Sequence, residues 1–164
     1  MNAAEVLQLC YKWAQNSPDP STQNAAILCA INPNGSLHPF NETLAVNEFP
    51  HGVSYSDERW ERPLKYAFIE HAERNCLFKA LRRGRCTTGL AMVCPWAACA
   101  DCARAIVQAG VKKLITQWFD DEDRWADSIA VAFTILAEGG VEVEFFEGKV
   151  GGDPIRRNGK LWQP

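Results

Sequence analysis

Two short motifs, each at the start of a helical pattern, constrain the fold of this chain more than any other feature. His71-Ala-Glu73 begins one pattern and Cys99-Ala-Asp-Cys102 begins the next, while residues 90–94 between them form a short apolar run typical of a strand. Two helices that begin at the same edge of a sheet would bring one imidazole, one carboxylate and two thiols together. The sequence therefore predicts a sheet with helices packed on it and these side chains gathered at one edge.

Helical and strand-like segments alternate along the rest of the chain as well. The spacing of apolar residues predicts helices over residues 3–15, 71–82, 99–109 and 121–137. Continuous or alternating apolar runs predict strands over residues 25–31, 44–46, 90–94, 113–116 and 141–146. This order indicates an α/β fold with helices on the faces of a sheet. The polar and aromatic segment 47–65 is predicted to be a long loop that could carry substrate contacts.

The two motifs supply donors that suit Zn²⁺. A catalytic zinc commonly takes three protein ligands and leaves a fourth position for water. A helix N-terminus lowers the pKa of a thiol, which favours Cys99 and Cys102 as thiolates bound to a cation. We therefore predict His71, Cys99 and Cys102 as zinc ligands and Glu73 as the catalytic group that moves protons.

Each motif alone has a plainer interpretation. A Cys-x-x-Cys pair can be two buried cysteines, and a lone histidine is more often a core residue than a ligand. The conjunction of the motifs favours the metal. A closed structural zinc site remains an alternative, with Cys94 or Cys86 as a fourth ligand and no room for water. The chain would then be a non-catalytic zinc-stabilised domain, and Glu73 would have no task.

Length, charge and cysteine content restrict the class of protein. The chain has 164 residues, which fits one domain, and its net charge of −3 favours a small substrate over a nucleic-acid strand. Residues 1–12 lack the apolar run of a signal peptide and no later run would span a bilayer, so we predict a cytoplasmic protein without a membrane partner. Seven cysteines would leave one unpaired in a disulfide framework, so metal binding and burial explain them better.

Four segments resemble the deoxycytidylate (dCMP) deaminase branch of the cytidine deaminase superfamily. They are Asp19-Pro-Ser-Thr-Gln23, Asn47-Glu-Phe-Pro-His-Gly-Val53, residues 65–75 and residues 99–111. The resemblance implies a three-layer α/β/α cytidine deaminase-like fold with a mixed sheet of about five strands and helices on both faces. It also implies homo-oligomers, with a nucleoside triphosphate effector in some members. Residues 1–147 are then a zinc-dependent deaminase domain and residues 148–164 a C-terminal tail.

Carried over by position, the resemblance makes His71, Cys99 and Cys102 zinc ligands and Glu73 the proton shuttle. It makes Asn47 a contact to a sugar hydroxyl. The other substrate-binding candidates are Ala72, Thr22 and Trp96. The predicted reaction converts dCMP, or a close cytidylate with a substituent at ring position 5, to the uridylate with release of ammonia. Another nucleoside, base or nucleic-acid substrate is the alternative within the same chemistry.

The chain departs from the family just before the zinc cysteines. Residues 95–98 read Pro-Trp-Ala-Ala where the family commonly has Thr-Leu-Phe-Pro. Trp96 either packs in the core or forms part of the base pocket, where its flat face would suit stacking. A pocket of altered shape is therefore expected here.

Phosphate recognition has several candidates in the sequence. Besides Ser21 and Thr22, three basic residues precede the catalytic helix and either bind phosphate or belong to a solvated loop; they are Arg59, Arg62 and Lys65. The tail, with Arg156, Arg157, Lys160 and Trp162, is either a flexible end or a flap that reaches a phosphate or a neighbouring subunit.

Overall fold

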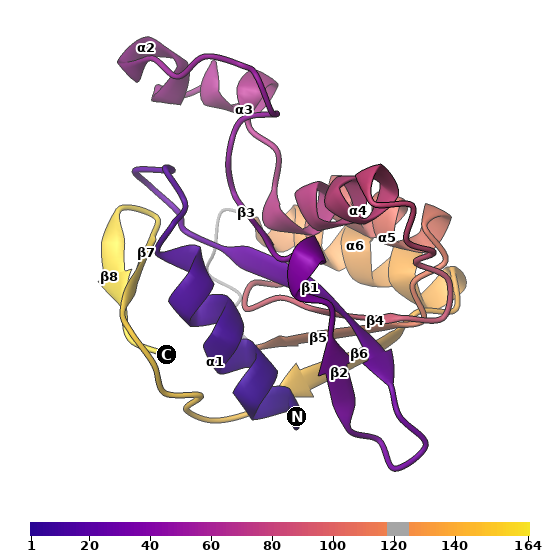
Figure 1. Cartoon of the computed structure of the whole chain (residues 1–164). Coiled ribbons are helices and arrows are strands. Elements are labelled where there is room, and N and C mark those ends of the chain that lie inside the picture. Colours follow the sequence, from indigo (N-terminus) through magenta and orange to yellow (C-terminus); the bar gives the residue numbers. More distant parts are fainter. Residues whose placement is uncertain (118–124) are drawn as a thin grey trace.

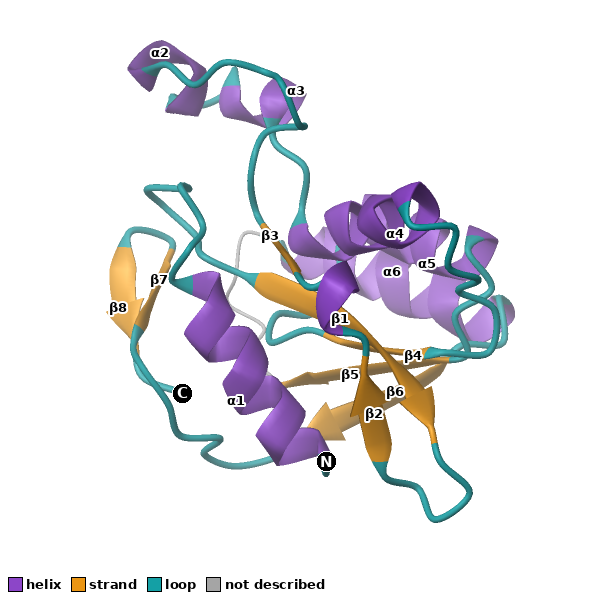
Figure 2. Cartoon of the chain, viewed as in Figure 1, coloured by secondary structure: helices purple, strands orange, loops and turns teal. Residues whose placement is uncertain are grey.

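A mixed β-sheet lies between two layers of helices in the computed structural model, which describes residues 1–117 and 125–164 (Figures 1 and 2). The strands follow the order β2 (Leu37–Pro39), β1 (Ala25–Ile31), β4 (Ala91–Val93), β5 (Lys113–Gln117) and β6 (Glu142–Phe146), and β3 (Ala45–Val46) pairs with β1. The pairs on β1 are antiparallel, whereas β4, β5 and β6 are parallel. The predicted mixed α/β sheet is confirmed.

Helices cover both faces of this sheet. Helix α1 (Ala3–Ala14) lies on one face, and α4 (Ala72–Arg82), α5 (Ala100–Gln108) and α6 (Ala126–Glu138) lie on the other (Figure 1). Parallel neighbours require a crossover, and α5 and α6 provide the crossovers β4–α5–β5 and β5–α6–β6. Residues 121–124 of the helix predicted over 121–137 lie outside the described part of the chain, and α6 covers the remainder.

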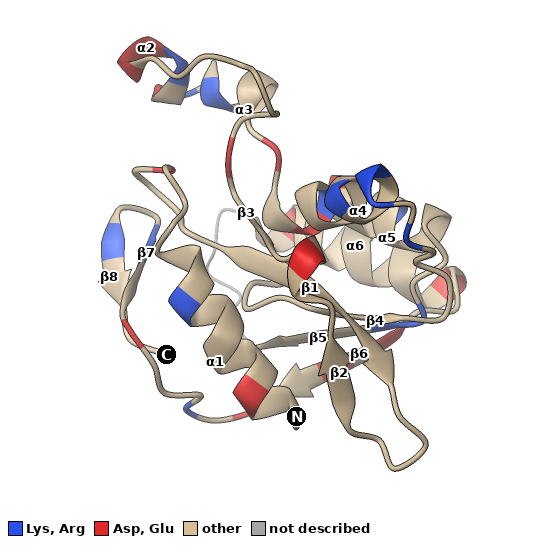
Figure 3. Ribbon diagram, in the orientation of Figure 1, with Lys and Arg blue, Asp and Glu red and all other residues tan. Residues whose placement is uncertain are grey.

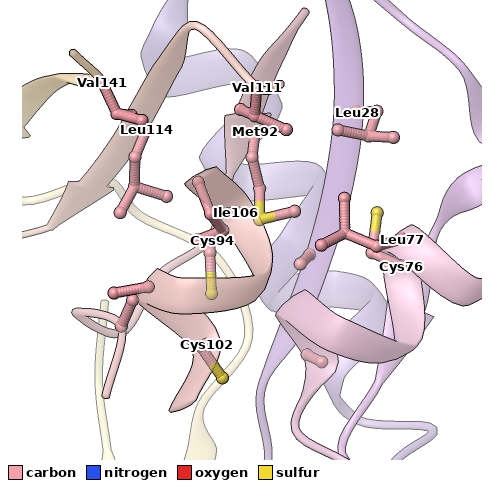
Figure 4. Packing of buried hydrophobic residues seen from close by; sticks show 14 of the residues in the cluster. Leu28, Cys76, Leu77, Met92, Cys94, Cys102, Ile106, Val111, Leu114 and Val141 are labelled. Atoms are coloured by element: carbon pink, nitrogen blue, oxygen red, sulfur yellow. The ribbon is translucent and has the colours of Figure 1, made fainter. Parts of the chain in front are cut away.

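Alternate residues of β1 enter two separate hydrophobic clusters. Ala26 and Leu28 face α4 and α5, while Ala25, Ile27 and Cys29 face α1. The strand is buried on both faces, which explains its continuous apolar sequence. Figure 4 shows part of the first cluster, where Met92, Ile106 and Leu114 are fully buried. Both motifs therefore begin helices that this cluster holds against the sheet.

The segment 47–68 differs in part from the predicted loop. It contains two short helices, α2 (Asp57–Trp60) and α3 (Lys65–Phe68), which extend away from the sheet and its helices (Figure 1). The Phe49 ring stacks on Trp60 with a centroid distance of 4.1 Å, and the tilted ring of Phe68 lies 5.6 Å from Phe49. Aromatic packing therefore gives this segment its own small core. Residues 41–43 also form a single 3₁₀ turn, η1 (Asn41–Thr43), before β3.

The C-terminal tail forms a β-hairpin. Strands β7 (Ile155–Arg157) and β8 (Lys160–Trp162) pair antiparallel across a turn at Asn158 and Gly159, which both have positive φ, 49° and 78°. A two-residue turn with positive φ at both positions is the type that Asn-Gly favours in hairpins. Ile155 is fully buried in the cluster that contains α1. The tail is therefore a folded hairpin packed on the domain, and contact with a phosphate or a neighbouring subunit stays a prediction.

Among the described residues, no helix combines the length and apolar character needed to cross a membrane.

Candidate active site

Three potential metal ligands converge where α4 and α5 begin. His71 is the residue that precedes the first turn of α4, Cys99 holds the same position in α5, and Cys102 lies in the first turn of α5. The Nδ1 atom of His71 lies 3.5 Å from Sγ of Cys99 and 3.6 Å from Sγ of Cys102. All three donor atoms lie within 4.8 Å of one another. The predicted convergence of the two helix starts is confirmed.

The separations of these donors fit zinc. Bond lengths of about 2.3 Å to sulfur and about 2.0 Å to nitrogen, at a tetrahedral angle, place the nitrogen and each sulfur about 3.5 Å apart. The measured N···S distances are 3.5 Å and 3.6 Å. One neutral imidazole and two thiolates are also ligands that Zn²⁺ commonly takes. The three residues therefore form a candidate zinc site with an open fourth position.

A fourth cysteine ligand is not part of this cluster within the described residues. Cys94 is buried, and its sulfur accepts a hydrogen bond from the Asn24 side-chain amide at 3.2 Å. Cys86 is exposed on the surface. Neither sulfur supports the closed structural site, so the geometry favours the catalytic alternative.

A hydrogen bond between the thiol groups of Cys99 and Cys102 shifts their pKa values in opposite directions. A hydrogen bond from the Cys102 thiol, together with contacts to His71, lowers the pKa of Cys99 to about 4. The same bond and burial raise the pKa of Cys102 well above its usual value. A dication between the sulfurs would take the place of the proton in this hydrogen bond, because thiolates are the metal-binding form.

Glu73 lies in the first turn of α4 and faces the pocket beside the metal ligands. It is 3% exposed, and its Oε2 atom has no hydrogen-bond partner among the described residues. Burial raises the pKa of this carboxyl to about 7. Buried polar atoms usually have partners, so an unpartnered carboxylate oxygen beside a metal site indicates a functional group.

The metal cluster opens into a pocket with a volume of about 280 Å³. Most of the predicted site residues line it, namely His71, Glu73, Cys99, Asn47, Thr22 and Trp96. Cys102 lies behind them, fully buried. Ala72 is also fully buried, and it is absent from the described residues that line the pocket.

Asn47 joins the loop that carries Thr22 to the first turn of α4. Its side-chain amide donates to the carbonyl of Thr22 at 3.0 Å and accepts from the backbone N–H of Ala72 at 2.8 Å. Asn47 and Ala72 were both predicted to contact the substrate. In the structure, the Asn47 side chain and the Ala72 backbone N–H are hydrogen-bonded to each other. A substrate that uses the Ala72 amide would have to replace the oxygen of Asn47.

Trp96 belongs both to the core and to the pocket. Its indole N–H donates to the carbonyl of Gln23 at 2.9 Å, and its ring meets Tyr11 and Trp162 edge to face at 6.5 Å and 5.7 Å. The ring is 8% exposed and lines the pocket. Trp96 therefore packs in the core, one of the two predicted alternatives, and also lines the pocket; a contact with the base of a substrate stays a prediction.

The three basic residues considered for phosphate binding have separate roles. The guanidinium of Arg59 donates to the carbonyl of Ser54 at 2.7 Å and lies 4.6 Å from the ring of Phe68. Arg62 donates to the hydroxyl of Ser21 at 2.8 Å. Of the three, Lys65 lines the described pocket, and phosphate binding by any of them stays a prediction.

A buried ion pair between Lys65 and Asp19 forms one edge of the pocket. The Nζ–Oδ1 distance is 2.7 Å, and the side chains are 4% and 1% exposed. The same carboxylate oxygen accepts the backbone N–H groups of Ser21 and Thr22 at 2.8 Å and 3.1 Å. The pair therefore fixes the loop that carries Thr22 and attaches the segment 47–68 to the sheet.

Replacing Lys65 by Met should lower the free energy of unfolding by about 3–5 kcal/mol, because the Asp19 carboxylate would stay buried without its cation. Urea unfolding followed by circular dichroism measures the change. Lys149→Met removes a charge from an exposed position and should change stability by less than about 0.5 kcal/mol. Equal stability of the two variants would contradict a structural role for the pair.

Among the polar residues that line the pocket, Asn24, Gln117 and Asn158 were not assigned to a site from the sequence, and Arg157 was considered only as part of a possible flap. Asn24 and Gln117 are polar residues at the ends of buried strands, a position that often carries function. The turn sequence Asn158-Gly159 could have indicated the hairpin. The sequence contains no signal that places this hairpin against the pocket, because that contact joins residues far apart in the chain.

Comparison with known proteins shows a clear family. A family model for the cytidine and deoxycytidylate deaminase zinc-binding region matches residues 1–117. A protein of Aliivibrio fischeri described as an uncharacterized deaminase in the luxG 3′ region is 32% identical over 141 residues, which are 85% of this chain and 87% of that protein. Human deoxycytidylate deaminase is 27% identical over 146 residues, 85% of this chain and 76% of the human protein.

Solved structures agree with the sequence relatives. The apo dCMP deaminase of cyanophage S-TIM5 matches with a TM-score of 0.57 and 26% identity, covering 87% of this chain and 98% of the phage chain. The same enzyme in complex with dCMP and dUMP matches with a TM-score of 0.56 and 28% identity, covering 87% and 90%.

Proposed function

The chain belongs to the cytidine and deoxycytidylate deaminase family, and we propose that it converts dCMP, or a close cytidylate substituted at ring position 5, to the uridylate with release of ammonia. The family and the three-donor cluster identify a zinc deaminase, a hydrolase that acts on carbon–nitrogen bonds. The observation that carries the proposal is the unpartnered, buried Glu73 oxygen beside the cluster of His71, Cys99 and Cys102.

The metal and Glu73 would divide the chemistry between them. When bound by His71, Cys99 and Cys102, zinc supplies an activated water at neutral pH. Glu73 takes a proton from that water and passes it to the ring nitrogen next to the reacting carbon. A carbon–oxygen bond forms at ring position 4, and Glu73 then helps the amino group leave as ammonia. One water and one cytosine ring give one uracil ring and one ammonia.

Residues around the pocket would position the substrate. Asn47 and Thr22 are held together by a hydrogen bond of 3.0 Å on one wall, and Trp96 presents part of a flat ring on another. A fixed wall of this kind favours one orientation of the reacting carbon relative to Glu73. We place the deaminase domain, with its metal ligands and Glu73, in residues 1–147, and Ala72 would contact the substrate through its backbone.

Two observations support a nucleotide over a nucleic-acid strand as substrate. The relatives named above include deoxycytidylate deaminases of phage and human origin. The net charge is −3, and in Figure 3 the basic residues of α4 and β8 lie in separate parts of the molecule, with acidic residues on α2. Proteins that follow a nucleic-acid strand usually present a continuous basic groove.

A substrate panel tests this proposal. The zinc-loaded protein is incubated with cytosine, adenine and guanine compounds as bases, deoxynucleosides and deoxynucleoside monophosphates, and ammonia is measured. We expect turnover of dCMP with a higher kcat/KM than for deoxycytidine. Turnover of deoxycytidine with none of dCMP would overturn the assignment to nucleotides.

Homo-oligomeric assembly, a cytoplasmic location and control by a nucleoside triphosphate are further proposals that rest on the family. Sedimentation of the zinc-loaded protein measures its oligomeric state. The same measurement with dCTP or dTTP added would test whether a nucleoside triphosphate changes that state.

A further inference from the structure

We propose that Arg157, on the C-terminal hairpin, binds the phosphate of the substrate and thereby selects nucleotides over nucleosides. This inference rests on the proposed deaminase function and names the residue that sets its substrate class. It assigns a role to residues 155–162, which lie outside the residues 1–117 that match the family model.

The hairpin is attached firmly to the loop that borders the pocket. The backbone N–H of Gln23 donates to the carbonyl of Arg156 at 2.8 Å, and the N–H of Arg156 returns a bond to the Gln23 side chain at 3.0 Å. At the turn, the N–H of Gly159 donates to the carbonyl of Ser21 at 2.8 Å. Ile155 is fully buried beneath. These contacts fix the position of the intervening Arg157.

Arg157 is held by aromatic rings at the pocket. Its guanidinium carbon lies 4.5 Å from the ring centre of Trp96 and 5.7 Å from that of Trp162. Arg157 and Trp96 both line the pocket that contains Glu73 and the metal ligands. A guanidinium over an aromatic ring keeps its N–H groups in one plane, the geometry suited to a phosphate or a carboxylate.

Among the described residues, acidic and basic groups both line the pocket, and Glu73 is one of the acidic ones. Asp19 and Lys65 compensate each other at 2.7 Å, and the charge of a bound Zn²⁺ would be balanced by its two thiolates. Arg157 adds a permanent positive charge, since a guanidinium does not lose its proton in proteins. A guanidinium can bind a phosphate through two parallel N–H groups, and a nucleotide has this phosphate whereas a nucleoside lacks it.

Polar groups next to Arg157 extend the same subsite. Thr22 and Asn158 line the pocket as well, and the backbone N–H of Asn158 donates to the hydroxyl oxygen of Thr22 at 3.2 Å. That bond leaves the hydroxyl hydrogen of Thr22 free to donate to an anion. The hairpin also packs on Trp96, part of the segment 95–98 where this chain departs from its family. The unusual tryptophan and the hairpin thus form one structural unit.

Arg157→Gln tests the proposal through the ratio of two substrates. We expect kcat/KM for dCMP to fall about 10- to 100-fold, the effect of losing a hydrogen bond to a charged group, while kcat/KM for deoxycytidine stays within about twofold. Lys160→Gln removes a charge from an exposed residue of the same hairpin and should leave both values unchanged. An unchanged ratio of dCMP to deoxycytidine in Arg157→Gln would overturn the proposal.

Binding of the products provides a second readout that needs no turnover. Calorimetry should show tighter binding of dUMP than of deoxyuridine to the wild-type protein, and this preference should be lost in Arg157→Gln and reduced in Arg157→Lys, which keeps the charge without the planar fork. Equal affinities of dUMP and deoxyuridine for the wild type would overturn the phosphate subsite even if the glutamine variant did not fold.

Different results would contradict the deaminase activity and the role of Arg157. A wild-type protein that releases no ammonia from any cytosine compound contradicts the deaminase function itself. A wild-type protein that deaminates dCMP, paired with an Arg157→Gln variant of the same substrate preference, contradicts the role of Arg157 alone.

Discussion

Replacing Glu73 by Gln should lower kcat for deamination by about 10⁴-fold, the upper end of the range for a positioned acid–base group. The large effect is expected because Glu73 handles both the proton from water and the departure of the amino group. Glutamine has nearly the same shape and cannot take up a proton at neutral pH. Ammonia release at saturating dCMP measures the loss, and metal analysis should show unchanged zinc content.

Stability should separate this effect from misfolding. The Oε2 atom of Glu73 is buried and has no hydrogen-bond partner in the described part of the chain, so an uncharged amide at this position should leave the melting temperature equal or higher. Glu138→Gln, on the exposed end of α6, is the matched control and should retain wild-type kcat. Appreciable activity of the Glu73 variant would mean that another group transfers the proton.

Replacing Cys102 by Ser should remove most of the bound zinc and, with it, the activity. A serine hydroxyl is a harder and far less acidic donor than a thiol, so a site that loses one of its two sulfurs binds zinc weakly at neutral pH. Zinc content after dialysis and ammonia release from dCMP measure the two losses. Excess zinc in the assay should restore part of the activity if the fold persists.

Two other cysteines give matched controls for this variant. Cys86→Ser changes an exposed thiol and should keep both zinc and activity. Cys94→Ser changes a buried thiol that bonds to Asn24 and should keep its zinc, although its stability should fall. Loss of zinc from Cys94→Ser would favour the closed structural site, because that site needs a fourth cysteine.

The metal cluster could be predicted from sequence because its geometry follows from local structure. His71 and Cys99 each precede the first turn of a helix, and Cys102 lies one turn further. Because α4 and α5 pack against each other on one face of the sheet, the residues that begin the two helices lie close together. Periodicity reveals the helices and the strands, so the site follows with few additional assumptions.

The rest of the pocket depends on contacts between distant residues. The bond between Asn47 and Ala72, the ion pair of Asp19 with Lys65 and the hairpin over Trp96 all join separate segments. Hydrophobic periodicity does not encode such pairings, and the short strand β2 and the helices α2 and α3 are too brief to produce a periodic pattern. A polar tail therefore resembles a flexible end in sequence although it folds against the pocket.

An open zinc site is the premise of every step of the proposed reaction. X-ray absorption at the zinc edge of the metal-loaded protein, without substrate, counts the ligands directly. We expect two sulfur atoms at about 2.3 Å and two lighter atoms at about 2.0 Å, one from His71 and one from water. Three sulfur atoms together with a single nitrogen would show a closed site and contradict the deaminase mechanism.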